Sequence, residues 1–175
     1  ALLRSYEGHT RRVRSVCVTS DNKYVVSGSD DKTICITCLK TGKLLRWIKG
    51  HTDDITSVCV TSDNKYVVSG SNYDGTIRIT RLDTGESVHV IKKNKFYRVY
   101  YVCVSSNNKY VVSDSHRTIR IFRLDTGELV RLIKHTSIIK GICVTSDNKY
   151  VVSGSCDKTV RITCLETGEL VRVIE

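Results

Sequence analysis

The heptapeptide Asp21-Asn22-Lys23-Tyr24-Val25-Val26-Ser27 decides the fold, because close copies of it return three more times along the chain. The copies occupy residues 63–69, 107–113 and 147–153. A second phrase, Thr-Gly, ends at Gly42, Gly85, Gly127 and Gly168. A repeat of about 42 residues is typical of arrays whose units cannot bury their apolar faces alone. The sequence therefore predicts one array of four units and a single domain over residues 1–175.

Each unit is predicted to contain four short antiparallel strands, so the fold class is all-β. In the first unit the segments 13–18, 24–27, 33–37 and 44–48 are rich in β-branched residues and show a period of two. The segments between them contain Ser, Asp, Asn and Gly, which form tight turns. The inner-strand units are placed at approximately residues 10–42, 52–85, 95–127 and 136–168, with outer strands between them and at both ends.

Several motifs in a fixed order resemble the WD-repeat family of β-propellers. In the first unit they are Gly8-His9 and the segments 15–21, 27–34 and 39–43. The resemblance implies a β-propeller built of four-stranded antiparallel blades, with four blades per chain. The Trp-Asp pair that gives the family its name is missing, and its positions hold Thr37-Cys38, Thr80-Arg81, Phe122-Arg123 and Thr163-Cys164.

Four blades are fewer than the seven that are typical of the family. Residues 2–6 resemble residues 170–174, which gives five outer strands for four sets of inner strands. We therefore expect two chains to form a homodimer with an eight-blade ring, in which terminal outer strands complete blades across the junctions. The alternative is that the chain is a piece of a longer propeller.

The formal net charge of +10 favours acidic partners. No segment has the 18 or more apolar residues of a membrane helix, and residues 1–4 lack the shape of a signal peptide. We expect an intracellular protein, in the cytoplasm or nucleus, with no membrane partner.

The eight cysteines do not predict disulfides or a metal site. Four of them recur at one point of each unit, and such points lie too far apart for a disulfide, so we expect buried thiols in a reducing compartment; they are Cys17, Cys59, Cys103 and Cys143. Cys35 and Cys38 have metal-ligand spacing, but residues three apart on a strand face opposite sides. Cys156 lies in a turn and is expected to be exposed and reactive.

His9, Ser27 and Asp31 have the residue types of a hydrolase triad. The same set recurs in two other units, as His51, Ser69 and Asp74 and as His135, Ser153 and Asp157. An enzyme rarely needs three copies of one active site, and the resemblance implies a structural hydrogen-bond network instead. In the third unit Asn94 stands near the His position and His116 replaces the Asp. We predict a protein that is not an enzyme and has no cofactor.

Function is expected in the loops that differ between units, because loops on a rigid scaffold carry binding. The loops before the inner strands and those between the second and third strands are expected on one face. Aromatic and cationic side chains there suit an acidic or phosphorylated peptide of a protein partner. The candidate binding residues are Arg11, Arg12, Asp53, Asp54, Tyr73, Lys95, Phe96, Tyr97, Arg98, His116 and Arg117.

Three alternatives stay open at this point. Tyr and Phe with the same positive charge suit a nucleic-acid-binding propeller. A self-assembling structural or designed unit would need no external ligand. The variation between loops is also compatible with neutral drift.

Overall fold

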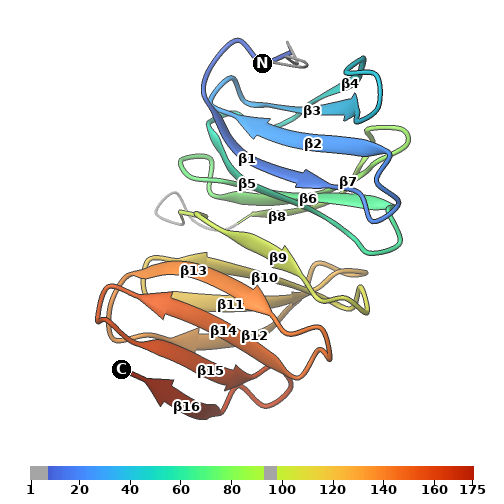
Figure 1. Ribbon diagram of the computed structural model, residues 1–175. Helices are drawn as coiled ribbons and strands as arrows, with labels where there is room; N and C mark the ends of the chain where they lie inside the picture. The colour runs from blue at the N-terminus through green and yellow to red at the C-terminus, as the bar shows by residue number, and fades with distance from the viewer. Residues whose placement is uncertain (1–7, 93–97) are drawn as a thin grey trace, which may run out of the picture.

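The computed structural model describes residues 8–92 and 98–175. The described residues form sixteen strands in four sheets, and each sheet has four antiparallel strands in chain order (Figure 1). The first and second sheets contain β1 (Val13–Val18), β2 (Tyr24–Ser29), β3 (Thr33–Cys38), β4 (Leu44–Lys49), β5 (Ile55–Val60), β6 (Tyr66–Ser71), β7 (Thr76–Arg81) and β8 (Ser87–Lys92). The third and fourth contain β9 (Val102–Val104), β10 (Tyr110–Ser115), β11 (Thr118–Arg123), β12 (Leu129–Lys134), β13 (Ile139–Val144), β14 (Tyr150–Ser155), β15 (Val160–Cys164) and β16 (Leu170–Ile174).

These sheets are the blades of a β-propeller, as the repeat predicts. No membrane-spanning helix occurs within residues 8–92 and 98–175.

The repeated heptapeptide forms the turn between the first two strands of each blade. Its Asn adopts a left-handed backbone in all four copies, with φ between 56° and 60°, a conformation that Asn tolerates better than most residues. In the first copy the carboxylate of Asp21 accepts hydrogen bonds from the Thr19 hydroxyl at 2.7 Å and from the Lys23 N–H at 3.1 Å. The turn is thus fixed by local hydrogen bonds, which explains why its sequence recurs.

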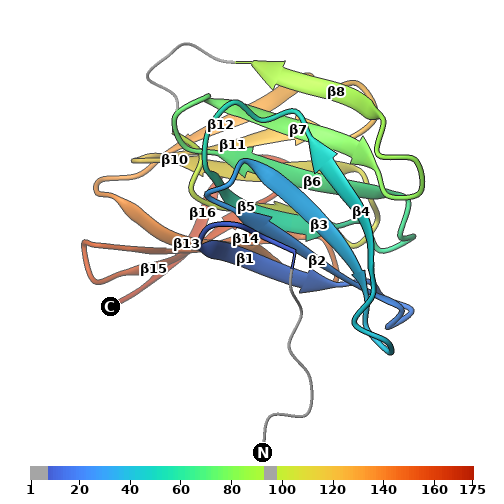
Figure 2. The ribbon, with the colours of Figure 1, turned by 90° about the horizontal axis from the view of Figure 1, so that it is seen from above.

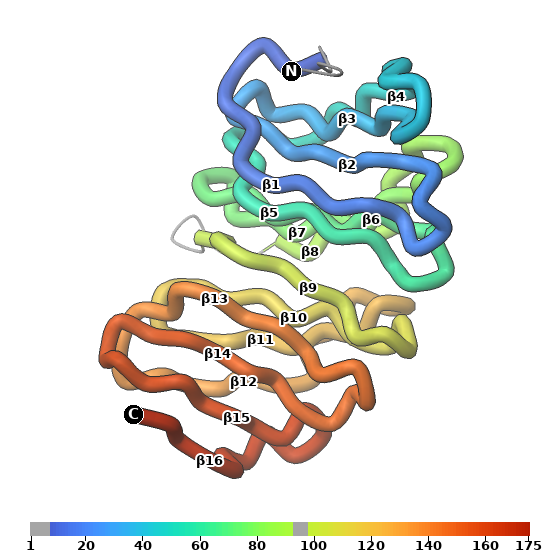
Figure 3. Tube along the Cα trace, in the orientation of Figure 1, coloured from blue at the N-terminus to red at the C-terminus, as the bar shows by residue number. Residues whose placement is uncertain are grey.

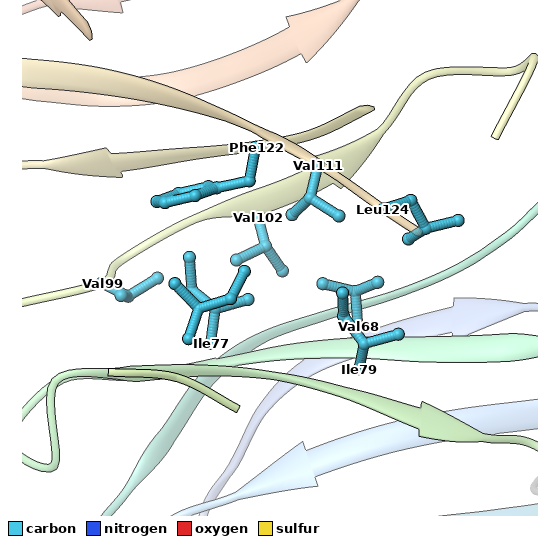
Figure 4. Close-up of a cluster of buried hydrophobic side chains, with 9 residues drawn as sticks. Val68, Ile77, Ile79, Val99, Val102, Val111, Phe122 and Leu124 are labelled. Atoms are coloured by element: carbon cyan, nitrogen blue, oxygen red, sulfur yellow. The ribbon is translucent and has the colours of Figure 1, made fainter. Parts of the chain in front are cut away.

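The hydrophobic core is divided into three clusters, one between each pair of consecutive blades. The cluster between the second and third blades combines Val68, Ile77 and Ile79 with residues of the next blade, including the fully buried Phe122 (Figure 4). Burial of each such side chain contributes about 1.5–3 kcal/mol. Each blade is therefore stabilised by its neighbour and not by a core of its own.

The packing is tight enough to require glycine in β2. A Cβ atom on Gly28 would lie 2.6 Å from Ile55 Cγ2 and 2.7 Å from Val58 Cγ1 of the next blade. Gly70 is enclosed in the same way by Val99 and Val102. These glycines let consecutive sheets approach each other closely.

The four blades form an open stack in which the inner strands β1, β5, β9 and β13 follow one another (Figures 1 and 3). One face of the first blade and one face of the fourth are uncovered, and the view from above looks onto the first blade, with β1, β2, β3 and β4 in front (Figure 2). Val16 on β1 is 64% exposed, whereas its equivalent Val58 on β5 is 4% exposed. The described chain therefore does not close a ring by itself.

Two expectations need correction or restriction. Cys143 was expected to be buried but is exposed, because it lines the uncovered face of the fourth blade. The outer strand β16 pairs with β15 of its own blade, so it is not available to complete a blade across a junction. Residues 2–6, the other proposed terminal strand, lie outside the described residues.

The third blade carries a buried carboxylate where the other blades have glycine. Asp114 is 0% exposed, and its Oδ1 accepts hydrogen bonds from the N–H groups of Tyr100 at 3.2 Å and Tyr101 at 2.7 Å. Its Oδ2 has no hydrogen-bond partner among the described residues. Burial raises the pKa of Asp114 to about 7, although the two N–H groups act in the opposite direction.

We predict that this carboxylate makes the protein less stable as the pH rises from 4 to 8. The folded-state pKa lies above the unfolded value of 3.8, so the contribution to stability is complete below pH 4 and is lost as the pH passes through about 7. A shift of this size corresponds to at most about 4 kcal/mol. Chemical denaturation at several pH values measures the loss.

The substitution Asp114→Asn is the matched control, since the amide oxygen can still accept the two N–H groups. The free energy of unfolding of this variant should vary less between pH 5 and 8 than that of the unsubstituted protein. Equal pH dependence in both proteins would contradict the assignment.

Candidate functional site

The His-Ser-Asp sets are buried hydrogen-bond networks that connect the loops of a blade. In the second blade His51 precedes β5, Ser69 lies on β6 and Asp74 precedes β7. His51 Nδ1 lies 2.8 Å from Asp74 Oδ2, and His51 Nε2 lies 2.8 Å from Ser69 Oγ. Because a carboxylate only accepts, Nδ1 donates to Asp74 and Nε2 accepts from the Ser69 hydroxyl. Ser69 is 0% exposed, so its hydroxyl is not accessible to a substrate.

The first blade repeats this network with nearly the same geometry. His9 lies 2.9 Å from Asp31 and 2.8 Å from Ser27. Burial alone would raise the pKa of Asp31, but hydrogen bonds from Thr33, the Thr10 N–H and His9 lower it to about 2. The pKa of Asp74 is likewise held well below its usual value against the effect of burial, chiefly by His51. Both carboxylates stay charged and act as fixed acceptors.

The fourth blade has only part of the network. His135 Nε2 lies 2.7 Å from Ser153 Oγ, but Nδ1 has no partner among the described residues. Asp157 instead accepts a hydrogen bond from the Thr136 hydroxyl at 2.6 Å and lies 3.5 Å from Arg161. Burial, together with the nearby Arg161, lowers the pKa of His135.

The third blade has a different arrangement at this position. His116, which replaces the Asp, is exposed and packs edge-on against Tyr100 with ring centroids 5.7 Å apart. Asn94, the residue near the His position, lies outside the described residues. The blade without the network is thus also the blade with the most divergent loops.

We predict that His51→Ala destabilises the fold by about 1–3 kcal/mol, because it leaves the buried Ser69 hydroxyl without its histidine partner and removes one of the hydrogen bonds to the Asp74 carboxylate. His116→Asn should change the stability by less than about 0.5 kcal/mol, since His116 is exposed and Asn tolerates its positive φ of 52°. Thermal and chemical denaturation of the two variants measure the difference. Equal losses in both would contradict a structural network at His51.

The two sets of variable loops meet at one edge of the blades, as expected. Backbone hydrogen bonds join them within three blades: Asp30 N–H donates to Arg12 O at 2.9 Å, and Asn72 N–H donates to Asp54 O at 3.3 Å. In the fourth blade Cys156 N–H donates to Ile138 O at 2.8 Å. We refer to this edge as the loop face.

A continuous series of contacts crosses the loop face from the second blade to the third. The Arg98 guanidinium lies 5.1 Å from the centre of the Tyr73 ring, a distance suited to a cation–π interaction. A hydrogen bond to Tyr100 raises the pKa of Arg98, and Tyr100 in turn contacts His116. We call the residues Tyr73, Arg98, Tyr100 and His116 the aromatic–cationic strip.

Three of the four residues in the strip belong to the candidate set, and Tyr100 was missed. Tyr100 precedes β9 and follows the candidate residues 95–98 of the third unit. Its alternation with Val99, which is fully buried, is the signal that would have placed it on the opposite, accessible side.

The other candidate residues are more dispersed. Arg11, Arg12 and Arg117 are exposed, and Arg12 Nε lies 3.9 Å from an oxygen of Asp30. Asp53 and Asp54 are half-buried, and the Asp53 carboxylate accepts the Asp54 N–H at 2.8 Å. Lys95, Phe96 and Tyr97 lie outside the described residues.

The thiols of the Cys-x-x-Cys pair are not arranged as ligands. Cys35 is buried on β3, and burial raises its pKa to about 11. Within residues 8–92 and 98–175 there is no group of three or more His, Cys, Asp or Glu side chains that could hold a metal ion. Cys156 is exposed, in agreement with the sequence prediction.

The chain contains four matches to a known repeat, each of which ends at the third strand of a blade; the last three begin at the outer strand of the preceding blade. The family model described as WD domain, G-beta repeat, matches residues 1–37, 42–80, 85–123 and 127–163. Single repeats also resemble the ribosome biogenesis protein BOP1 homologs of Drosophila grimshawi, Drosophila ananassae and Drosophila melanogaster, each 52% identical over 40 residues. Each of these matches covers 23% of this chain and 5% of the relative. Since the family matches span most of the chain, it belongs to the WD40 family of G-beta repeat proteins.

Proposed function

We propose that this protein is a non-enzymatic scaffold that binds an acidic or phosphorylated segment of a partner protein through its loop face. WD40 repeats form scaffolds for protein interactions. The proposal adds the binding surface of this scaffold and the chemistry of the segment that it binds. The observation that carries the proposal is the position of Arg98 within the aromatic–cationic strip.

Arg98 is held in place by aromatic contacts and is not neutralised by a carboxylate. Tyr73 supports its guanidinium and Tyr100 hydrogen-bonds to it. No ion pair between Arg98 and an acidic side chain occurs among residues 8–92 and 98–175. A guanidinium fixed in this way offers paired N–H donors to a carboxylate or phosphate without a large loss of side-chain entropy.

The surroundings of Arg98 suit an extended acidic segment. Tyr73 is 57% exposed, which leaves its ring available for apolar contact, and the exposed Arg117 follows His116 in the next loop. The net charge of +10 adds long-range attraction for an acidic partner. We propose an intracellular location for this interaction, where phosphorylated segments occur.

The repeat shared with the BOP1 homologs does not identify the partner. The similarity covers 5% of each of those proteins, so it concerns the repeat and not their assembly. The exposed Tyr73 also favours a second candidate, the stacking of unpaired nucleic-acid bases.

Binding of fluorescent peptides tests the proposal. A set of acidic peptides, each with and without phosphorylation, is titrated with the protein and with the variants Arg98→Ala and Arg117→Ala. Loss of a charge-assisted hydrogen bond costs about 1.5–3 kcal/mol, so Arg98→Ala should weaken binding about tenfold or more. Lys109→Ala removes an exposed charge in the β9–β10 turn, at the opposite edge of the same blade, and should have little effect.

Equal losses for Arg98→Ala and Lys109→Ala would show attraction by net charge alone and would contradict a site on the loop face. A single-stranded oligonucleotide that binds more tightly than every peptide, with affinity falling steeply between 50 and 200 mM salt, would favour the nucleic-acid alternative.

A further inference from the structure

The three contacts between consecutive blades share three parts, with His89 in place of an arginine at the second contact. The first and fourth blades each carry an unmatched half of every part. The first part is apolar. Between the first and second blades one blade contributes Val26, Ile34, Ile36 and Ile48, and the next contributes Ile55, Val58, Val67 and Leu82. All eight side chains are at most 8% exposed.

The uncovered faces carry the equivalents of these eight residues. Strand register places Val152, Val160, Ile162 and Ile174 on the fourth blade where the first half would lie. It places Val13, Val16, Val25 and Leu39 on the first blade where the second half would lie. Several of them are strongly exposed: Val160 by 38%, Ile174 by 49%, Val13 by 46% and Val16 by 64%.

The shape of the fourth blade matches as well. Gly154 corresponds to Gly28 and Gly70, whose missing side chains leave room for the next inner strand. At Gly154 a Cβ atom would meet nothing within 4 Å. The space that Ile55 and Val58 fill next to Gly28 is thus open next to Gly154, and the equivalent residues Val13 and Val16 are exposed at the other end of the stack.

The second part is a polar seam between the turns that contain the repeated heptapeptide. Ser20 Oγ donates to Ser62 O at 2.9 Å, and Ser20 N–H donates to Asn64 Oδ1 at 2.9 Å. Ser62 makes the same two contacts with the third turn, to Ser106 O and Asn108 Oδ1. In the next pair the Ser106 hydroxyl donates to Ser146 O and Asn148 Oδ1, and the Asn107 N–H donates to Asn148 Oδ1. Among the described residues, Asn22 then lacks a preceding Ser, and the Ser146 N–H and hydroxyl lack a following Asn.

The third part connects an outer strand to the next blade. Arg46 on β4 donates to Asp83 O at 2.6 Å and to Thr84 O at 2.8 Å, and Arg131 on β12 donates to Thr167 O at 2.7 Å. The equivalent residue of the fourth blade, Arg172, is exposed on β16. The equivalent acceptors of the first blade are the carbonyl groups of Lys40 and Thr41.

We propose that a second copy of this chain docks its first blade on the fourth blade of the first copy, and that two such junctions close a ring of eight blades. The uncovered faces are complementary in their apolar residues, in the space at Gly154, in the Ser–Asn seam and in the arginine contact. A contact between two different faces closes into a ring when its rotation allows, and eight blades lie within the usual range of four to eight for propellers. The proposal is independent of peptide binding at the loop face.

One contact of the first junction has no counterpart in the proposed one. Val58 N–H donates to Ser15 Oγ at 3.1 Å, whereas Gly141 occupies the position of Ser15 in the fourth blade. The third junction of the chain also lacks this bond, because Tyr101 occupies the position there. The missing bond is therefore compatible with a stable junction.

Size-exclusion chromatography with light scattering tests the proposal on the full chain. The chain mass is 19.7 kDa, and the expected particle has twice that mass. Because each copy carries a charge of +10, association should be stronger at 0.5 M than at 0.05 M salt. The variants Val16→Glu and Gly154→Val should each be monomeric at concentrations where the unsubstituted chain is dimeric.

Mixing the two variants provides the sharpest result. Val16→Glu leaves the fourth-blade face intact, and Gly154→Val leaves the first-blade face intact, so an equimolar mixture should form one junction and regain the dimer mass. Gly154→Val introduces its side chain into open space within a single chain, so circular dichroism should show an unchanged strand spectrum. Val130→Glu is the matched control, because Val130 is 40% exposed in a blade with neighbours on both sides.

Four results would overturn the proposal. The first is a chain that stays at the monomer mass at millimolar concentration. The second is a ladder of masses, which would mean that head-to-tail docking does not close at two copies. The third is a variant that stays dimeric on its own, which would indicate contact between identical faces. The fourth is a monomer that associates only with a separate chain carrying other WD repeats, which would assign the faces to such a chain.

Discussion

The burial of one sheet face against the next sheet is the interaction on which this structure depends. Val16 and Val58 have the same residue type and the same register in their blades, yet they are 64% and 4% exposed. The difference is the presence of a preceding blade. A single four-stranded blade cannot bury its apolar faces alone, so the free energy of folding is shared between neighbours, as in other repeat proteins.

This constraint explains where the sequence is invariant between repeats and where it is not. Glycine is required at positions 28 and 70 by the approach of the next inner strand, and the heptapeptide turn is required by the seam between blades. The His-Ser-Asp networks connect the loops to the strands through hydrogen bonds between side chains that lie beneath the loop face. The loop face is thus free to vary on a fixed support, and the greatest variation occurs in the third blade.

Most of the fold could be predicted from the sequence because the same strand and turn patterns recur in four units. The strands, the turns and the grouping into four blades all follow from the spacing of the heptapeptide and the Thr-Gly phrase. The loop face could be predicted as a region, but its contacts could not. Tyr100 contacts both Arg98 and His116, and the alternation with Val99 indicates that it faces away from the core but not which side chains it meets. The exposure of Cys143 depends on the absence of a blade after the fourth one. Asp157 accepts a hydrogen bond from Thr136 in place of His135, and Arg161 lies 3.5 Å from the same carboxylate.

Two irregularities of the third blade, its short inner strand and its buried carboxylate, are connected by hydrogen bonds. Its inner strand β9 has three residues, whereas β1, β5 and β13 have six each. The N–H groups of Tyr100 and Tyr101, which precede β9, are satisfied by the Asp114 carboxylate in place of part of the strand ladder. Asp114 in turn occupies the position where the other blades have glycine. Tyr100, one of the two residues whose N–H groups Asp114 accepts, also contacts His116. The buried Asp114 carboxylate therefore fixes the backbone of Tyr100, a member of the aromatic–cationic strip. An ionisable residue in the core is thus linked to the surface where this scaffold differs most from a regular repeat.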